Sequence, residues 1–299
     1  MKSLSLILGA VAVTQVHGHG GIYNYTIAHE HYVGHYPWLP EDGQESIQRR
    51  WWPDPIYRTD HPYLACNRGN PLATSFPKLH ARVQAAQQVV GFYNPPPCPT
   101  SPPVPFPTEP SVPDYGEEPN PMKCSGPEYQ WVHSQGPMLV YMADCQGPCD
   151  QWDGTGKRWF KIWEAGYEPK GWPYSYHYGT DMPISAKDRW WQDYAIEGGY
   201  ASFNATIPAT LKPGYYLIRH EVINLEASMQ FYPECAQLEV TGDGKDFPSD
   251  DYLVSFPGAY SPDDPGLKVA GELYNPKIGH SIYNYTIPGP KVWKPWELM

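Results

Sequence analysis

Apolar and polar residues alternate along much of the chain after residue 82, in short runs where every second residue is apolar. These runs are Phe160 with Ile162, residues 201–207, and Tyr216 with Ile218 and Val222. Clusters of Pro, Gly, Asn and Asp separate them. A period of two places the apolar side chains on one face of a strand. The pattern therefore predicts an all-β fold, an antiparallel β-sandwich.

Helical signals are confined to two short segments, residues 45–50 and 186–194. The chain has no long amphipathic helix and no alternation of strands with helices. We therefore expect only short helices at the margins of the sandwich.

Residues 95–121 contain 12 prolines and no hydrophobic periodicity. Such a stretch favours extended polyproline conformations and does not build a core. It is expected to be a surface loop within one domain, residues 19–299, rather than a linker, because cysteines flank it and the strands on both sides need each other. Nothing after Trp293 resembles a linker and a further binding module.

The first 18 residues have the features of a secretory signal peptide: Lys2, the apolar run 4–13, and small or polar residues up to Gly18. The apolar run is too short to span a bilayer. We expect cleavage after Gly18, which makes His19 the first residue of a secreted, extracellular protein. Loss of Lys2 takes the formal charge to −12, with 20 basic against 32 acidic residues.

Aromatic residues make up 15% of the chain and charged residues only 18%. Exposed rings suit stacking on the apolar faces of sugars, but a large aromatic core explains the composition equally well. The formal net charge of −11 argues against nucleic acid and against anionic membrane surfaces as partners.

In an oxidising compartment the six cysteines indicate disulfides. Fifteen pairings are possible, and one of them is our expectation. Cys145 and Cys149 are close enough to close a local loop, Cys98 and Cys124 flank the proline-rich segment, and Cys66 and Cys235 remain for a long-range bond. Three sequons for N-glycosylation begin at Asn24, Asn204 and Asn284.

An N-terminal histidine can chelate one metal ion through its α-amine and its Nδ1 atom, and a second histidine can add a third nitrogen. Cu(II) favours this T-shaped set and tetrahedral Zn(II) does not. His133, at the entrance of a strand-like run, is the second candidate ligand. If residues 230–235 form a strand, Gln230 and Tyr232 project to the same face, so Tyr232 could be axial to the metal. Taken singly, each residue is equally compatible with an ordinary surface or loop position.

Several motifs, in the same order, resemble those of the fungal lytic polysaccharide monooxygenases of auxiliary activity family 9. They are His19-Gly20, Ala65-Cys66-Asn67, and residues 133–137, 159–162, 164–166, 211–221, 230–235, 256–260 and 285–290. The resemblance covers most of residues 130–293 and is looser in the N-terminal third.

The resemblance implies an immunoglobulin/fibronectin-like sandwich whose long loops form a flat substrate face, and one copper ion. By the same resemblance His19 and His133 are the equatorial ligands, Tyr232 is the axial one, and Gln230 is an outer hydrogen-bond donor. It also supports the Cys66–Cys235 and Cys145–Cys149 bridges.

The implied activity is oxidative cleavage of glycosidic bonds in cellulose or a related β-glucan or hemicellulose. Hydroxylation at C1, at C4 or at both would use O₂ or H₂O₂ and an external electron donor, either a small reductant or a secreted dehydrogenase. We expect a monomer that binds neither nucleic acid nor membranes.

The chain departs from the family pattern at Glu226, about where relatives have a histidine near the bound oxygen species. Glu226 could replace that histidine as a proton donor only if its pKa were raised. His220 is close in sequence, but its place in the Arg219-His220-Glu221 strand favours a structural core histidine. For substrate contact the resemblance implies Tyr274, with Tyr36 and Trp38 in the N-terminal loops, although core packing is as plausible for the latter two.

Two rival hypotheses belong to other classes of protein. One is a copper-binding relative that does not cleave its ligand, and the other is a non-catalytic carbohydrate-binding sandwich that works without metal. A zinc hydrolase is disfavoured because the chain has no His-Glu-X-X-His run.

Overall fold

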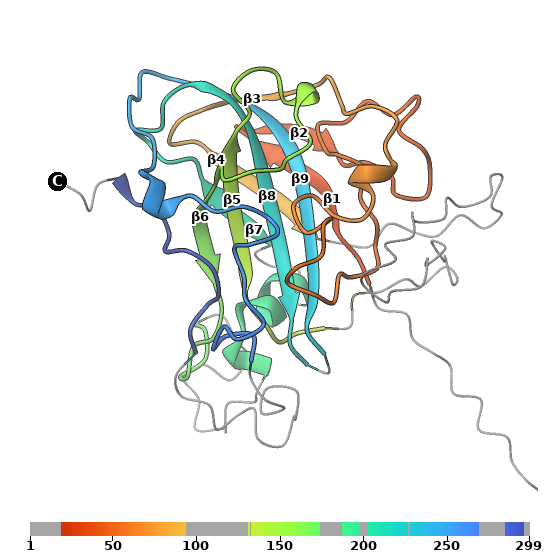
Figure 1. The fold of residues 1–299 in the computed structure, drawn as a ribbon. Coiled ribbons are helices and arrows are strands. Elements are labelled where there is room, and N and C mark those ends of the chain that lie inside the picture. Colours follow the sequence, from red (N-terminus) through yellow and green to blue (C-terminus); the bar gives the residue numbers. More distant parts are fainter. Residues whose placement is uncertain are drawn as a thin grey trace, which may run out of the picture.

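The computed structural model describes residues 19–93, 131, 133–173, 187–197, 202–226, 228–268 and 285–295. These residues form two β-sheets (Figure 1). The strand order is β2-β1-β4-β7 in the four-stranded sheet and β3-β9-β8-β5-β6 in the five-stranded sheet. In the first sheet the bounds are β1 Ile22–Ile27, β2 Glu30–Val33, β4 Gln88–Tyr93 and β7 Phe203–Thr206. In the second they are β3 Ala81–Gln84, β5 Met138–Asp144, β6 Trp159–Ala165, β8 Gly214–Asn224 and β9 Gln230–Thr241.

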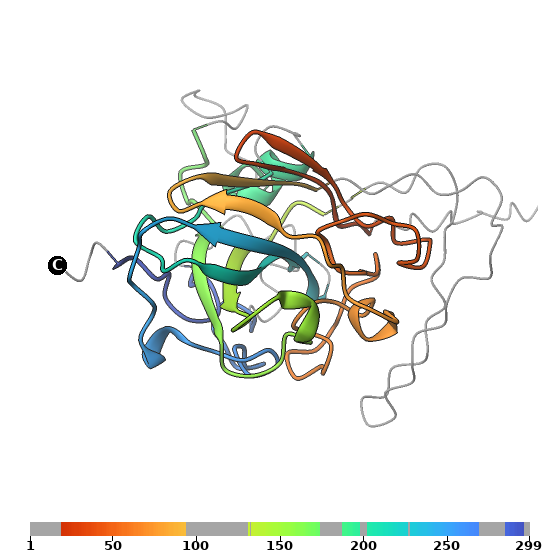
Figure 2. The same ribbon diagram turned by 90° about the horizontal axis from the view of Figure 1, so that it is seen from above.

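The two sheets form the layers of a β-sandwich (Figure 2), which confirms the predicted fold class. Strand β7 shows why the sequence alternates, since Phe203 and Ala205 are buried while Asn204 and Thr206 are exposed. Burial of one face of each strand removes apolar area from water and drives the two sheets together.

Strand β5 is apolar along nearly its whole length because both of its faces are covered. Met138, Val140 and Met142 belong to the core between the sheets. The alternate residues Leu139, Tyr141 and Ala143 belong to a second hydrophobic cluster on the outer face of the five-stranded sheet. The loops that follow β2 supply part of that cluster, including Ile56 and Leu64.

One strand pair is parallel, against the antiparallel expectation. Strand β3 runs parallel to β9, with Ala81 opposite Leu238, while every other pair in the two sheets is antiparallel. Alternation of apolar residues gives the faces of a strand but not its neighbour or direction, so this pairing had no signal in the sequence.

The predicted helix at 45–50 is wrong. This segment is extended along the edge of β9, where the Arg49 N–H donates to the Cys235 carbonyl over 2.9 Å and the Gln237 N–H donates to the Ile47 carbonyl over 2.9 Å. The prediction at 186–194 is confirmed in part, by the single-turn helix η4 (Lys187–Arg189) and the start of the π-helix η5 (Asp193–Glu197). The other short helices are η1 (Asn70–Leu72), η3 (Cys149–Gln151) and η6 (Asp250–Tyr252).

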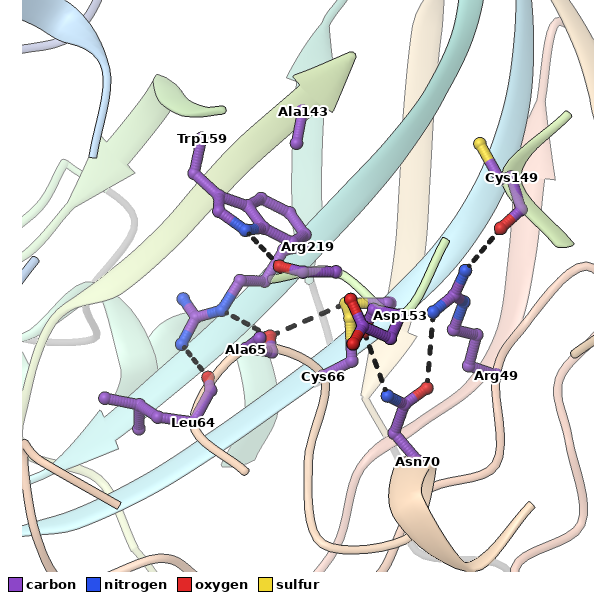
Figure 3. Close-up of a disulfide and its surroundings, with 12 residues drawn as sticks. Arg49, Leu64, Ala65, Cys66, Asn70, Ala143, Cys149, Asp153, Trp159 and Arg219 are labelled. Atoms are coloured by element: carbon purple, nitrogen blue, oxygen red, sulfur yellow. Dashed lines mark hydrogen bonds between the residues drawn. A yellow bond between two sulfur atoms is a disulfide. The ribbon is translucent and has the colours of Figure 1, made fainter. Parts of the chain in front are cut away.

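Two of the expected disulfides are present, Cys66–Cys235 and Cys145–Cys149. The first bridge ties the N-terminal loops to β9. Figure 3 shows Arg219 beside it, donating to the carbonyl oxygens of Ala65 and Leu64 at 2.8 and 2.9 Å. The expected partners Cys98 and Cys124 lie outside the described residues.

The buried guanidinium of Arg219 also pairs with Glu221, its neighbour two residues along β8, at 2.6 Å. A buried charge is tolerated only when it is paired and hydrogen-bonded, and here the carboxylate and two backbone carbonyls meet that requirement. These contacts fix the course of residues 64–66 against the sheet.

His220 is a core residue, as predicted. Its ring is fully buried between Phe203 and Tyr25, with ring centroids 5.0 and 5.7 Å away. None of the helices in the described part of the chain has the length and apolarity needed to cross a membrane.

Candidate copper site

His19 lies immediately before β1, and close packing fixes the path of the chain there. The Tyr93 hydroxyl donates to the Gly20 carbonyl over 2.8 Å. A Cβ atom on Gly21 would lie 2.3 Å from a carboxylate oxygen of Glu234 and 2.5 Å from the Trp51 ring, so only glycine fits at this position. The first residues of the domain are thereby held against the edge of the sandwich.

The imidazole of His19 contacts a carboxylate that the sequence analysis did not single out. Its Nδ1 atom lies 2.6 Å from Oδ1 of Asp54, and Trp52 Nε1 donates to the other carboxylate oxygen over 3.2 Å. Burial alone would raise the pKa of Asp54, but the hydrogen bonds from His19 and Trp52 and the charges of His19 and Arg68 together lower it. A chelate through the amine and Nδ1 of His19 requires that this contact be given up.

His133 lies in an aromatic cluster around Tyr232. The ring centroids of His19 and His133 are 6.0 and 6.3 Å from that of Tyr232, and Trp131 contacts both Tyr232 and His133 at 4.8 and 5.0 Å. The two imidazoles therefore flank one buried tyrosine, although 114 residues of sequence separate them. The Nε2 atom of His133 is buried and has no hydrogen-bond partner among the described residues.

Tyr232 and Gln230 share one face of β9, as the alternation predicted. The Tyr232 hydroxyl donates to Oε1 of Gln230 over 2.6 Å, while Phe231 packs in the outer cluster. The amide nitrogen of Gln230 donates to Oγ of Ser228 over 3.1 Å. Gln230 therefore lies beside Tyr232, and its donor is directed to the turn between β8 and β9.

Glu226 is also in this turn, and it faces the His133 loop. Its carboxylate oxygens accept hydrogen bonds from the backbone and side chain of Ser134, at 2.8 and 2.7 Å, and lie 3.0 Å from His133 Nδ1. Burial alone would raise the pKa of Glu226, but the hydrogen bonds from His133 and Ser134 outweigh it and lower the pKa. The shift is opposite to the one that the proton-donor role requires.

The nitrogen atoms of His19 and His133 fit a histidine brace for copper better than they fit a metal site built from three or more side chains. Among the residues the structure describes, no cluster of three or more His, Cys, Asp or Glu side chains could hold a metal ion. A brace needs only two histidines, since the amine of the first residue supplies the third nitrogen. His133 Nε2 is buried and has no hydrogen-bond partner in the described part of the chain, and such a nitrogen is costly unless it binds something.

The expected substrate platform is corrected at one position. Trp38 is 2% exposed and packs in the interior, so it offers no ring to a polysaccharide. Trp51 and Trp52 are buried as well. Tyr36 is half-buried, and its N–H donates to the side chain of Gln44. Tyr274 lies outside the described residues.

Of the three sequons, Asn204 is exposed on β7, whereas Asn24 is half-buried on β1 between β2 and β4. Asn284 lies outside the described residues. Of the two described sequons, the exposed Asn204 leaves more room for a glycan than the half-buried Asn24.

The model of auxiliary activity family 9, formerly glycoside hydrolase family 61, matches residues 19–283. The chain belongs to this family. Members are copper-dependent oxidoreductases that act on polysaccharides, so the chain is a lytic polysaccharide monooxygenase at the family level.

Two relatives in family 9 match over nearly the whole chain. The chain is 33% identical to lytic polysaccharide monooxygenase D of Thermothelomyces thermophilus, over 98% of this chain and 94% of that protein. It is 31% identical to monooxygenase B of Heterobasidion irregulare, over 95% and 96%. The crystal structure of a cellulose-active polysaccharide monooxygenase from M. thermophila superimposes with a TM-score of 0.66 and 33% identity, covering 92% of this chain and 99% of that one.

Sequence reasoning missed two parts of this site in the family 9 chain. Asp54 lies between two prolines in a segment without periodicity, 35 residues from His19. Ser134 was part of a quoted motif, but nothing in the sequence linked it to Glu226, 92 residues away. Neither contact leaves a pattern in one sequence.

Proposed function

We propose that the chain is secreted, begins at His19 after removal of residues 1–18, and cleaves cellulose or a related β-glucan or hemicellulose oxidatively. One copper ion would be held by His19 and His133, with Tyr232 as the third residue of the site. Hydroxylation would occur at C1, at C4 or at both. The protein would work as a monomer with a small reductant or a secreted dehydrogenase as its electron donor.

The observation that carries this proposal is the pair of imidazoles around Tyr232. His133 brings a buried Nε2 atom without a partner to the same tyrosine that His19 contacts. The match to the family begins at residue 19, which supports cleavage after Gly18. The solved relative described as cellulose-active supports cellulose as the substrate.

Copper, when bound, supplies the one-electron redox chemistry that activates O₂ or H₂O₂. The chain supplies the geometry. His19 and His133 hold two sides of the site. The Tyr232 ring, next to both imidazoles, is fully buried and so inaccessible to bulk water. Its hydrogen bond to Gln230 fixes where the phenol oxygen lies.

The proposal is tested by incubating the secreted protein with phosphoric-acid-swollen cellulose, ascorbate and oxygen, and analysing the soluble products by mass spectrometry. Oxidised oligosaccharides are expected, and His133→Ala should abolish them. Glu30→Gln, an exposed change on β2, is the control that should retain activity. Xyloglucan and xylan are tested in parallel, and absence of oxidised products from all three polymers would contradict the proposal.

A copper-binding relative that does not cleave its ligand is the second candidate. It is favoured by Glu226, whose carboxylate is engaged by His133 and Ser134 where family members have a histidine. This candidate predicts copper binding that depends on His133 without oxidised products. A metal-free carbohydrate-binding protein would instead bind the polymers unchanged in the presence of a chelator.

A further inference from the structure

Glu226 is attached to the His133 loop by three hydrogen bonds. Oε1 accepts from the backbone N–H and the hydroxyl of Ser134, and Oε2 lies 3.0 Å from His133 Nδ1. The two side chains are 23% and 13% exposed, so water competes little for this contact. The Glu226 carboxylate thus bridges the proposed ligand His133 and the next residue, Ser134.

The bonding at Glu226 determines which nitrogen of His133 carries the proton. A carboxylate accepts hydrogen bonds but has no proton to donate. Its contact with His133 therefore needs an N–H at Nδ1. A neutral ring protonated at Nδ1 has its lone pair at Nε2, the buried atom without a partner among the described residues. A lone pair at that position is what a metal ion requires of an imidazole ligand.

The turn that carries Glu226 is itself fixed to the site. The Glu226 N–H donates to Oδ1 of Asn224 over 3.1 Å, and Nδ2 of Asn224 donates to Oε1 of Gln230 over 3.1 Å. That same oxygen accepts from the Tyr232 hydroxyl. The Leu225 N–H also donates to the Gln135 carbonyl over 2.9 Å, which extends the β5–β8 pairing to the His133 loop. One hydrogen-bond network therefore joins His133 to Tyr232.

We propose that Glu226 is a positioning residue: it holds the His133 ring in one orientation and in the Nδ1–H tautomer, with the Nε2 lone pair ready for copper. The identity of the metal rests on the proposed function, whereas the tautomer is a property of the metal-free protein. Carboxylates that hold metal-binding histidines in this way commonly improve metal affinity 10–100-fold.

Two substitutions separate this role from a general structural one. In Glu226→Gln the amide oxygen can still accept from Ser134, so the amide nitrogen is left facing Nδ1. An amide nitrogen donates, so the His133 ring should change to the Nε2–H tautomer. Glu226→Ala removes both interactions and leaves the tautomer unspecified. Glu30→Gln makes the same chemical change on the exposed face of β2 and serves as the matched control.

The tautomer is measured by long-range ¹H–¹⁵N correlation of the imidazoles in the secreted protein after removal of metal with a chelator. We expect Nδ1–H at His133 in the wild type and in Glu30→Gln, and Nε2–H in Glu226→Gln. Circular dichroism establishes that each variant is folded. If Glu226→Gln retains the wild-type tautomer at His133, or the wild type has Nε2–H there, the proposal is overturned.

Copper affinity, measured by competition with a chelator of known strength, provides the second readout. Glu226→Ala should bind Cu(II) about 10–100-fold more weakly, and Glu226→Gln should also bind more weakly. Unchanged affinity in both variants would contradict the positioning role. Failure of the wild type to bind copper would overturn the proposed function instead, and the tautomer measurement would still decide the role of Glu226.

Discussion

The hydroxyl of Tyr232 donates a hydrogen bond to Oε1 of Gln230 over 2.6 Å, within the buried end of β9. The two residues are neighbours on one face of the strand, and Asn224 at the end of β8 donates to the same oxygen. A buried hydroxyl needs a partner, and this one has an acceptor whose position is fixed from a second strand. The phenol oxygen is thereby held in place before any metal binds.

Replacement of Tyr232 with Phe should keep the packing of the ring and remove the hydroxyl donor. Gln230 Oε1 retains the bond from Asn224, so no buried acceptor is left without a partner. We expect a loss of about 1 kcal/mol in the free energy of unfolding of the metal-free protein. Urea denaturation followed by fluorescence measures it.

Tyr57→Phe is the control for this change, because the Tyr57 side chain is 44% exposed. Substitution of so exposed a side chain should alter stability by less than about 0.5 kcal/mol. A loss in Tyr232→Phe no larger than in this control would show that the bond to Gln230 does not stabilise the fold.

The two described disulfides should differ in their contribution to stability, because they close loops of very different length. Cys66–Cys235 spans 169 residues and Cys145–Cys149 spans 4. From loop-closure entropy, replacing both cysteines with alanine should cost about 5 kcal/mol for the long bridge and about 2 kcal/mol for the short one. Guanidinium unfolding of the two double variants measures these losses.

A larger loss from removing Cys145–Cys149 would contradict this order. The long bridge also lies next to the bonds from Arg219 to Ala65 and Leu64, so its removal should expose residues 64–66 to hydrogen exchange before the sheet itself opens.

The pH dependence of stability should contain a contribution from His220. Burial lowers the pKa of this histidine to about 3. In the unfolded chain the ring takes up a proton below about pH 6.5, while in the folded protein it remains neutral. The unfolded state therefore binds more protons in this range, and stability falls as the pH falls from about 6.5 towards 3.

His220→Leu removes this contribution. Between pH 7 and pH 5 the free energy of unfolding of the wild type should fall by about 2 kcal/mol more than that of the variant. Urea titrations at pH 7, 6 and 5 measure it. His31→Leu, at an exposed position on β2, is the matched control and should follow the wild type. A constant difference between wild type and His220→Leu across this range would refute the assignment.

The sequence could predict what depends on local periodicity. The strands around Phe160, Phe203 and Ile218 were expected because their apolar residues alternate, and the shared face of Gln230 and Tyr232 follows from the same rule. The core position of His220 was expected from its place in such a strand. His19 and His133 were candidate metal ligands from their chemistry, but only the resemblance to a family singled them out, since one histidine in a loop carries no pattern of its own.

What the sequence could not predict depends on contacts across long separations. Trp38 lies in a loop-rich segment without periodicity, so its burial could not be distinguished from exposure. The pairing of β3 with β9 and the contact of Asp54 with His19 depend on how loops fold back over the sandwich. Glu226 meets His133 across 93 residues. Its role therefore changes from expected proton donor to hydrogen-bond acceptor only when the two loops are seen together.

The free amine of His19 should control copper binding directly. A protein whose His19 amine is acetylated keeps the imidazole, but an amide N–H stands where the chelating amine would be. Competition with a chelator should show at least about a 100-fold weaker affinity for Cu(II) than in the protein that begins at His19 with a free amine, because loss of an outer-shell contact alone costs 10–100-fold. Mass spectrometry of each preparation identifies its first residue and shows whether it is acetylated.

Electron paramagnetic resonance of the Cu(II) forms gives a readout that does not depend on activity. The protein that begins at His19 should give a type 2 spectrum with couplings to nitrogen, and His133→Ala should lose part of that coupling. With the His19 amine acetylated, Nδ1 of His19 has no chelating amine beside it to compete against Asp54, 2.6 Å away. If the two preparations bind copper equally and give the same spectrum, the amine is not a ligand and the histidine brace is excluded.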